Sequence, residues 1–265
     1  MLSTNKKTNL IALRIYKNTS NLYQQMLKLN NSSVNYKLFS SQLGEFPNVS
    51  PLLINTINQY SYCIAEEDAE FKKALIDSDI LLPDGISMVL VSKFLNGQKI
   101  KKIAGADIHR YYLKVLNSKA GKCFYLGSSS STLGKIVTKL NQEYPKIQVQ
   151  TFSPPFKPLF TAAENMEMID AINSFKPDVL FVGMTAPKQE KWATQHKHEI
   201  QAKAICTIGA VFDFYAETVE RPSQLWINLG LEWFVRLVKE PKRMWKRYIY
   251  YGPVFIYKII KEKLN

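Results

Sequence analysis

Residues 79–95 read DILLPDGISMVLVSKFL and contain one complete strand–turn–helix unit. The short apolar run Ile80–Leu82 predicts a buried strand, and Ile86–Leu95 has the length and amphipathic pattern of a helix. Between them, Pro83-Asp84-Gly85 is a turn sequence. A strand that leads through a short turn into a helix is the building unit of α/β folds.

The same alternation continues on both sides of this unit. Further strands are predicted at Leu52–Ile57, Cys123–Leu126, Ile147–Phe152, Val179–Val182 and Ile205–Ile208. Further helices are predicted at Ala65–Ser78, Asp107–Asn117, Leu133–Glu143, Ala162–Phe175 and Gln189–His198. This order indicates an α/β fold with a largely parallel sheet and helices on both faces. We divide the chain into a polar extension (1–35), an α/β core (36–220) and a basic, aromatic-rich C-terminal appendage (221–265).

Composition excludes several classes of protein. The chain has 265 residues, of which 46% are apolar and 22% charged, so it can bury a core and is not disordered. Its three cysteines are widely separated, which indicates neither a disulfide framework nor a zinc site and favours a reducing cytoplasm. We identify no signal peptide, and the longest apolar run, Tyr248–Ile260, is broken by Gly252-Pro253 and Lys258. We therefore expect neither a secreted protein nor an integral membrane protein.

The positive charge is concentrated at one end of the chain. Residues 221–265 hold ten Lys or Arg against three Glu, a net +7 of the total +13, and three of the four tryptophans. Three interpretations stay open on composition alone. The segment is an interfacial helical element on anionic lipid, a nucleic-acid-binding element, or a helix that packs its aromatic residues on the core with a solvated basic face.

Polar side chains follow the first two predicted strands. Ligands bind outside the carboxyl ends of parallel strands, so these are the candidate site positions. Thr56 and Asn58, spaced i and i+2 in extended chain, lie on one face and can bind a sugar or nucleotide, or are simply turn residues. Asp84 precedes a helix and is either an ordinary N-cap or a general base for an attacking hydroxyl.

Three later strand ends add candidates. Gly127 with Ser128–Thr132 makes a phosphate cradle or an ordinary turn, but neither a G-x-G-x-x-G motif nor a P-loop. Lys188 and Gln189, after the fifth predicted strand, are expected to point into the same crevice, and Asp213 follows the sixth. We assign no metal site: His196 and His198 point apart on a helix, and Asp77-Ser78-Asp79 precedes a strand, at the wrong sheet edge.

Taken in order, these strand-end motifs resemble the WecG/TagA/CpsF family of bacterial glycosyltransferases. The resemblance covers roughly residues 50–250. It rests on Thr56-x-Asn58, Asp68-Ala69-Glu70-Phe71, Leu82-Pro83-Asp84-Gly85, Ala104-Gly105-Ala106-Asp107, Tyr125-Leu126-Gly127, Pro177-Asp178-Val179-Leu180, Pro187-Lys188-Gln189-Glu190, Phe212-Asp213-Phe214, Arg221, Leu231-Glu232-Trp233, Arg236-Leu237 and Glu240-Pro241-x-Arg243.

The resemblance implies an activity. It implies metal-independent, inverting transfer of N-acetylmannosamine, or its uronic acid, from a UDP donor to a polyprenyl-diphosphate-linked acceptor. The reaction would serve cell-envelope polysaccharide synthesis at the inner face of the cell membrane. The resemblance also implies a Rossmann-like core and an appendage that sits on the membrane and closes over the active site. The alternatives are a non-catalytic UDP-sugar-binding protein or a basic nucleic-acid-binding protein, and a homo-oligomer is left open.

The resemblance also implies roles for individual residues. Asp84 matches the proposed catalytic base, with Thr56 and Asn58 beside it. Gln189 and Asp213 match positions lining the donor site. Arg236, Arg243 and Lys246 match appendage positions that contact diphosphates.

Two positions depart from the family pattern. Lys102 stands where the family has Arg, which keeps the charge but loses the bidentate fork. Arg221 is followed by Pro222-Ser223 in place of the usual Ala-Pro. Neither departure removes the proposed base, so we expect an active enzyme without a cofactor.

Overall fold

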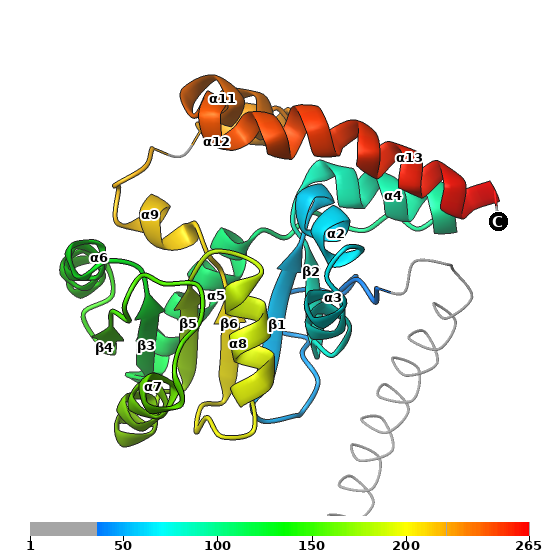
Figure 1. Ribbon diagram of the computed structural model, residues 1–265. Coiled ribbons are helices and arrows are strands. Elements are labelled where there is room, and N and C mark those ends of the chain that lie inside the picture. The colour runs from blue at the N-terminus through cyan, green and yellow to red at the C-terminus, as the bar shows by residue number, and fades with distance from the viewer. Residues whose placement is uncertain (1–35, 221, 265) are drawn as a thin grey trace, which may run out of the picture. The chain divides into compact units, whose positions relative to one another are not determined.

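Six parallel strands form one open sheet in the computed structural model, which describes residues 36–220 and 222–264 (Figure 1). The strands are β1 (Leu52–Ile57), β2 (Ile80–Pro83), β3 (Lys122–Gly127), β4 (Gln148–Phe152), β5 (Val179–Gly183) and β6 (Ala204–Thr207). Their spatial order is β2-β1-β6-β5-β3-β4, and every adjacent pair is parallel. All six predicted strands are present. The predicted extension 1–35 and Arg221 lie outside the described residues.

Helices cover both faces of the sheet, as predicted. One face packs against α5 (Gly105–Lys119), α6 (Ser130–Glu143) and α9 (Val211–Tyr215). The other packs against α7 (Ala162–Phe175) and α8 (Lys188–His196), with α3 (Ala69–Ile76) beside α8. Successive residues of a strand point to opposite faces of the sheet. Tyr125 packs on the face covered by α5, α6 and α9, and Phe124 packs on the face covered by α7 and α8. The α/β fold class is therefore confirmed.

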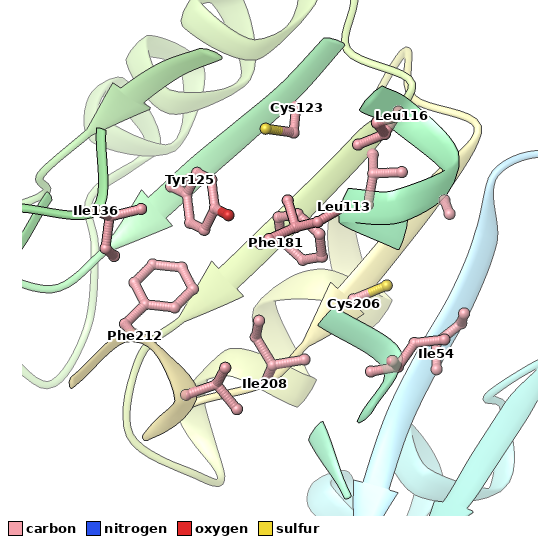
Figure 2. Packing of buried hydrophobic residues seen from close by; sticks show 14 of the residues in the cluster. Ile54, Leu113, Leu116, Cys123, Tyr125, Ile136, Phe181, Cys206, Ile208 and Phe212 are labelled. Atoms are coloured by element: carbon pink, nitrogen blue, oxygen red, sulfur yellow. The ribbon is translucent and has the colours of Figure 1, made fainter. Parts of the chain in front are cut away.

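Aromatic rings fill the core under α5 and α9 (Figure 2). The ring centroid of Tyr125 lies 5.0 Å from that of Phe181 and 5.2 Å from that of Phe212. His109 Nε2 lies 2.7 Å from the Tyr125 hydroxyl. Burial lowers the pKa of His109 to about 3, so its imidazole is neutral. This histidine is therefore a core residue.

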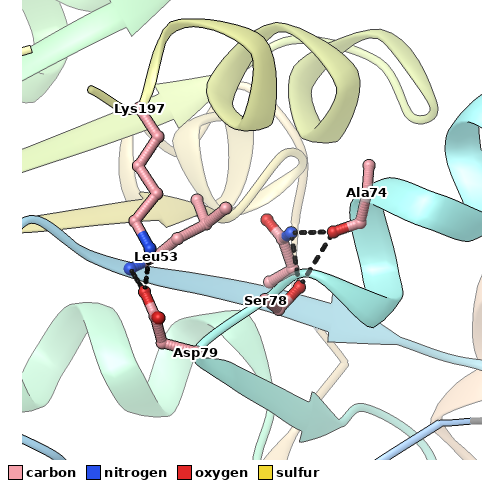
Figure 3. A network of polar contacts seen from close by, with 6 residues as sticks. Leu53, Ala74, Ser78, Asp79 and Lys197 are labelled. Carbon is pink, nitrogen blue, oxygen red and sulfur yellow. Dashed lines mark hydrogen bonds and ion pairs between the residues drawn. The ribbon is translucent and has the colours of Figure 1, made fainter. Parts of the chain in front are cut away.

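A polar network holds the amino-terminal edge of the sheet together (Figure 3). Asp79 Oδ2 accepts a hydrogen bond from the backbone N–H of Leu53 at 2.7 Å and pairs with Lys197 at 2.7 Å. Asn55 Nδ2 donates to Ser78 Oγ at 2.8 Å. Asp79 thus joins β1, β2 and the end of α8, which gives this aspartate a structural role at the amino-terminal edge of the sheet.

The predicted helix Ala65–Ser78 corresponds to α3, which is shorter, and the helix before it, α2, was not predicted. The chain forms α2 (Gln59–Ala65), turns, and then forms α3 from Ala69, with Asp68 as its N-cap. Asn58 caps α2 in a capping box with Ser61. The capping side chains Asn58 and Asp68 fix where the two helices begin, and apolar periodicity alone showed neither start. Between β2 and α5 lies α4 (Ile86–Asn96).

The C-terminal segment is helical. It comprises α10 (Gln224–Asn228), α11 (Glu232–Lys239), α12 (Pro241–Trp245), a π-helical turn (Lys246–Tyr250, η2) and α13 (Tyr251–Leu264). Phe255 of α13 stacks edge-on against Tyr62 of α2 at 5.3 Å, and Phe255 and Ile259 are buried. Pro253 lies just after the π-helical turn, within a helix that continues without a break from Pro241 to Leu264. No helix in the described part of the chain has the length and apolarity needed to cross a membrane.

Candidate active site

Asp84 lies at the carboxyl edge of the sheet, directly after β2. Its backbone N–H donates to the carbonyl of Ile57 at 2.9 Å, so it continues the β1–β2 pairing by one residue. Gly85 follows with φ +118°, and a Cβ there would lie 3.9 Å from the Cβ of Asn58. Asp84 and Asn58 therefore lie side by side at the ends of adjacent strands.

Thr56 and Asn58 belong to the same face of β1. Leu52 and Ile54 point toward α5, and alternation places Thr56 on that side too. Asn58 keeps an extended backbone, with φ −132° and ψ 177°. Its Oδ1 accepts hydrogen bonds from the N–H groups of Tyr60 and Ser61 at 3.0 and 3.1 Å. Asn58 is therefore the N-cap of α2, and the cap uses only Oδ1, which leaves Nδ2 to serve a ligand.

The carboxyl of Asp84 is a stronger base than an ordinary aspartate. Burial, followed by the negative charge of Glu232, raises its pKa from 3.8 to about 6. Lys102 and Arg236 act in the opposite direction. Near neutral pH this carboxyl is ionised and can accept a proton, which is the state that a general base requires.

Lys102 and Glu232 connect the core to the C-terminal segment at this point. Their side chains form an ion pair, with Lys102 Nζ 2.8 Å from Glu232 Oε2, and both are half-buried. The next residue, Ile103, donates its N–H to the carbonyl of Pro83 at 3.0 Å. Lys102 is thereby held beside the end of β2, where the sequence predicted a cation.

Three arginines of α11, α12 and η2 lie within electrostatic reach of one another, and one of them, Arg236, is also within reach of Asp84. Arg236 stacks its guanidinium over the ring of Phe214 at 5.3 Å, and its Nε is buried without a hydrogen-bond partner. Arg247 lies over the ring of Tyr60 at 4.7 Å. Burial lowers the pKa of Arg247, with further contributions from Arg236 and Arg243. A buried N–H donor among clustered cations favours the binding of an anion such as a diphosphate.

Gln189 lies farther along the edge, where β5 and β6 end. Its Oε1 accepts from the N–H of Met184 at 3.2 Å, and its Nε2 donates to Glu190 Oε1 at 2.8 Å. A Cβ on Gly209 would lie 3.3 Å from that Nε2, so the amide lies against the end of β6. Lys188 turns away instead: its Nζ lies over the Phe160 ring at 3.6 Å. The expectation that Lys188 and Gln189 share a crevice is therefore wrong.

Gly127 ends β3 opposite Gly183, the last residue of β5. A Cβ on Gly127, whose φ is +114°, would lie 2.4 Å from the carbonyl oxygen of Gly183. A Cβ on Gly183 would meet the Phe212 ring at 2.5 Å, so neither position has room for a side chain. From β3 the chain turns through α6 to β4, and from β5 it turns the other way through α8 to β6. This reversal is the switch point at which α/β sheets bind ligands.

Asp213 of α9 is half-buried and lies within electrostatic reach of Arg243. Burial raises its pKa, and Arg243 opposes that shift. Arg243 Nη2 pairs with Glu240 Oε2 at 2.5 Å. Lys246 is exposed in η2. Arg243 is thus linked to Asp213, whereas Lys246 faces solvent.

The candidate residues form two groups along one edge. Thr56, Asn58, Asp84, Lys102 and Arg236 lie around the ends of β1 and β2, and Gln189 and Gly127 lie at the ends of β5 and β3. Sequence reasoning assigned no role to Glu232, Arg247 or Glu190, nor to Tyr248, which lies within electrostatic reach of Asp84. Of these, Glu232 and Glu190 belong to motifs that carry the family resemblance, and this was the sequence feature that could have identified them as site residues. In the described residues, no three His, Cys, Asp or Glu side chains are grouped to hold a metal.

Comparison with known proteins gives a consistent result. The model of the glycosyl transferase WecG/TagA/CpsF family matches residues 25–265. A Bacillus subtilis (strain 168) N-acetylglucosaminyldiphosphoundecaprenol N-acetyl-beta-D-mannosaminyltransferase is 30% identical over 213 residues, 80% of each chain. Enzymes with the same name from Bacillus spizizenii (strain W23) and Staphylococcus aureus (strain MW2) are each 26% identical. Their matches cover 75% of each chain in the first case, and 80% of this chain and 81% of the relative in the second.

Proposed function

Because the chain belongs to the WecG/TagA/CpsF family of glycosyl transferases, we propose that it transfers an N-acetylmannosamine-type sugar. The donor is a UDP-sugar, and the acceptor is a polyprenyl-diphosphate-linked sugar, N-acetylglucosamine by analogy with the names of the relatives. The observation that carries the proposal is the position of Asp84. It is a partly buried carboxyl with pKa about 6 at a sheet edge, with Lys102 and Arg236 nearby.

The proposed reaction is a single displacement in which Asp84 is the base. Asp84 takes the proton of the acceptor hydroxyl as that oxygen attacks the anomeric carbon of the donor. The bond from the anomeric carbon to the diphosphate oxygen breaks, and UDP leaves from the opposite face. The configuration at the anomeric carbon is therefore inverted. Thr56 and Asn58, beside Asp84, orient the acceptor hydroxyl.

The negative charge that develops on the leaving diphosphate requires cations. Arg236 is the best placed because its Nε–H is buried and unpaired. Lys102 forms an ion pair with Glu232, and Arg243 forms one with Glu240. Each cation can therefore bind the diphosphate when the diphosphate displaces the paired carboxylate. Lys246 and Arg221 are assigned supporting phosphate contacts. With these cations in place, we propose that the reaction needs no metal.

We propose that the UDP-sugar lies along the sheet edge. Gln189 and Gly127, with Asp213, would bind the donor at the switch point, three or four strand positions from β2. Adjacent strands are about 4.8 Å apart, so this separation is on the order of 15 Å. An extended ligand is needed to connect these positions with Asp84, and a nucleotide-sugar is such a ligand.

We place the enzyme at the inner face of the cell membrane, held there by residues 221–265 as a C-terminal appendage. Three tryptophans of this segment, Trp226, Trp233 and Trp245, are exposed. Indole rings favour the boundary between lipid and water, and the surrounding Lys and Arg favour anionic lipid.

The experiment that tests the proposal is a transfer assay with defined donors. UDP-N-acetylmannosamine, its uronic acid and UDP-N-acetylglucosamine are offered separately with a polyprenyl-diphosphate-linked N-acetylglucosamine, with and without EDTA. We expect a disaccharide product from a mannosamine-type donor at a rate unaffected by EDTA. Transfer only from UDP-N-acetylglucosamine, or a product of retained configuration, would contradict the proposal. Loss of activity with EDTA would contradict the metal-independent mechanism.

A further inference from the structure

Helix α4 carries apolar side chains on its solvent face. Ile86, Leu90 and Phe94 follow at intervals of four residues and therefore form one stripe. Their exposed fractions are 43, 58 and 52%. The buried positions of the same helix, Met88 and Val91, pack into the protein. A surface helix usually turns polar residues outward, so an apolar stripe on this side requires a partner.

The C-terminal segment borders this stripe at both ends. A Cβ on Gly230, between α10 and α11, would lie 3.7 Å from Ile86 Cγ1. At the other end, Lys263 Nζ donates to the carbonyls of Phe94 and Leu95 at 3.1 and 3.2 Å. The C-terminal end of α13 therefore meets the C-terminal end of α4. The neighbours of these contact residues in the chain, Leu229 and Leu264, are exposed. The α4 stripe is therefore continuous with the exposed apolar side chains of the C-terminal segment.

The charged residues of the chain segment that carries the stripe are all positive. Residues 85–106 contain four lysines and no Asp or Glu. Lys93, Lys99 and Lys101 are exposed. An exposed apolar stripe with three exposed lysines in and just after its helix has the character of a surface that binds anionic lipid. A second copy of the chain fits less well, because two-fold pairing would bring these lysines together.

We propose that the α4 stripe, Ile86, Leu90 and Phe94, is a membrane-docking surface of the core and contacts anionic bilayer lipid together with the C-terminal segment. The inference rests on the proposed function for its membrane location and adds a second contact surface to it. Helix α4 begins two residues after Asp84. Docking of α4 therefore sets the edge that carries Asp84 close to the lipid headgroups, where a polyprenyl diphosphate presents its sugar.

The test compares two sets of surface variants in vesicle sedimentation. Ile86→Ser/Leu90→Ser/Phe94→Ser removes the stripe, and Ile76→Ser/Met166→Ser alters exposed apolar residues of α3 and α7 as a matched control. With vesicles of phosphatidylglycerol and phosphatidylcholine, we expect the stripe variant to bind at least about tenfold more weakly. The control should bind like the unaltered chain. Equal binding of both variants would overturn the proposal.

A second variant protects the test against misfolding. Lys93→Glu/Lys99→Glu/Lys101→Glu is expected to lose binding to anionic vesicles about tenfold or more, because each cation contributes near the surface. Its binding to pure phosphatidylcholine should not change. If full binding to anionic vesicles persists, the proposal is wrong. If sedimentation velocity shows instead that the stripe variant dissociates a dimer, the surface joins two copies and the lipid proposal is also wrong.

Failure of the proposed function can be recognised separately. The stripe residues do not belong to the catalytic or substrate-binding groups, so transfer to a short-chain acceptor in solution should match the unaltered chain. If no variant transfers sugar in solution but the stripe variant still loses vesicle binding, the proposed function fails and the docking surface stands. If the stripe variant transfers sugar normally in solution and binds vesicles as well as the unaltered chain does, the proposed function stands and the docking surface fails.

Discussion

Asp84 is buried enough to keep its proton to a higher pH than an ordinary aspartate does. The charged groups near it include the cations Lys102 and Arg236 and the anion Glu232. The desolvation penalty and Glu232 raise its pKa, and Lys102 and Arg236 limit the rise to about 6. This balance leaves a carboxylate that is ionised at neutral pH and still basic enough to accept a hydroxyl proton as the bond forms.

The pH dependence of the reaction should report this balance. We expect kcat/KM to rise with pH through an inflection near 6, because only ionised Asp84 is active. Lys102→Met removes a cation and leaves Glu232 unpaired, so the inflection should move to higher pH. Initial rates from pH 5 to 8 measure both. An inflection near pH 4, or one that Lys102→Met leaves in place, would contradict the assignment.

Glu190 is the other carboxyl with an unusual environment. It is buried, its Oε2 has no hydrogen-bond partner, and burial raises its pKa from 4.5 to about 7. The folded state therefore keeps a proton that the unfolded chain releases above pH 4.5, and stability from this group is lost as pH rises from 4.5 to 7.

Glu190→Gln should expose this dependence, since glutamine mimics the protonated carboxyl and still offers Oε1 to Gln189. The variant should gain stability relative to the unaltered chain as pH rises from 4.5 to 7, by up to about 3 kcal/mol. Above pH 7 the difference should level off. Urea unfolding at several pH values measures it, and a difference independent of pH would show that Glu190 is ionised in the folded chain.

At the scale of elements, local pattern predicted the strands well because all except the partly exposed edge strand β4 are short, mostly buried runs. It failed at α2, whose apolar residues pack on α13 and not on the sheet. Tyr62 meets Phe255 and Cys63 Sγ contacts the carbonyl of Tyr251, almost 200 residues away in sequence. Because α13 is so far from α2 in the sequence, the residues around α2 do not reveal which of its faces is buried.

The site was predictable only in part for the same reason. Strand ends pointed to Asp84, Asn58 and Gln189, because parallel strands bring their carboxyl ends to one edge. The surroundings of Asp84 come from the C-terminal segment, through Glu232 and Tyr248. Only the folded chain brings these residues together, so no spacing rule could have joined them to Asp84.

Asn58 allows its capping role to be separated from its proposed contact with substrate. Serine is a comparable N-cap, so Asn58→Ser should keep the stability of α2, whereas Asn58→Ala should lose about 1 kcal/mol. Both variants lose the Nδ2 donors, and both should lose transfer activity to a similar degree. Thermal unfolding and transfer assays measure the two effects. Full activity in Asn58→Ser would mean that Asn58 is a cap only.

For the whole molecule, the concentration of charge in the last 45 residues gains a structural meaning. The segment both packs on α2 through buried residues and exposes aromatic and basic side chains. Two of the three interpretations of its composition therefore apply together: packing on the core is observed, and lipid binding is proposed for the exposed side. The boundary at residue 220 stays a prediction, since residues 38–265 form one compact unit.

Two neighbouring residues of α13 distinguish these roles. Phe255 is buried against α2 and Ile256 is exposed. Phe255→Ala should reduce the free energy of unfolding by about 3 kcal/mol, because it leaves a cavity. Ile256→Ala should change it by no more than about 0.5 kcal/mol and should weaken vesicle binding instead. Denaturant unfolding and vesicle sedimentation measure both. Equal stability of the two variants would contradict the packing of α13.

The central claim is that Asp84 is the base for sugar transfer, and single-turnover transfer by Asp84→Asn tests it most directly. Ionised Asp84 costs the folded state stability at neutral pH, so the variant should be at least as stable as the unaltered chain. We predict unchanged UDP binding and a transfer rate lower by about 10²–10⁴. Transfer at a near-normal rate in a folded, UDP-binding variant would contradict the account.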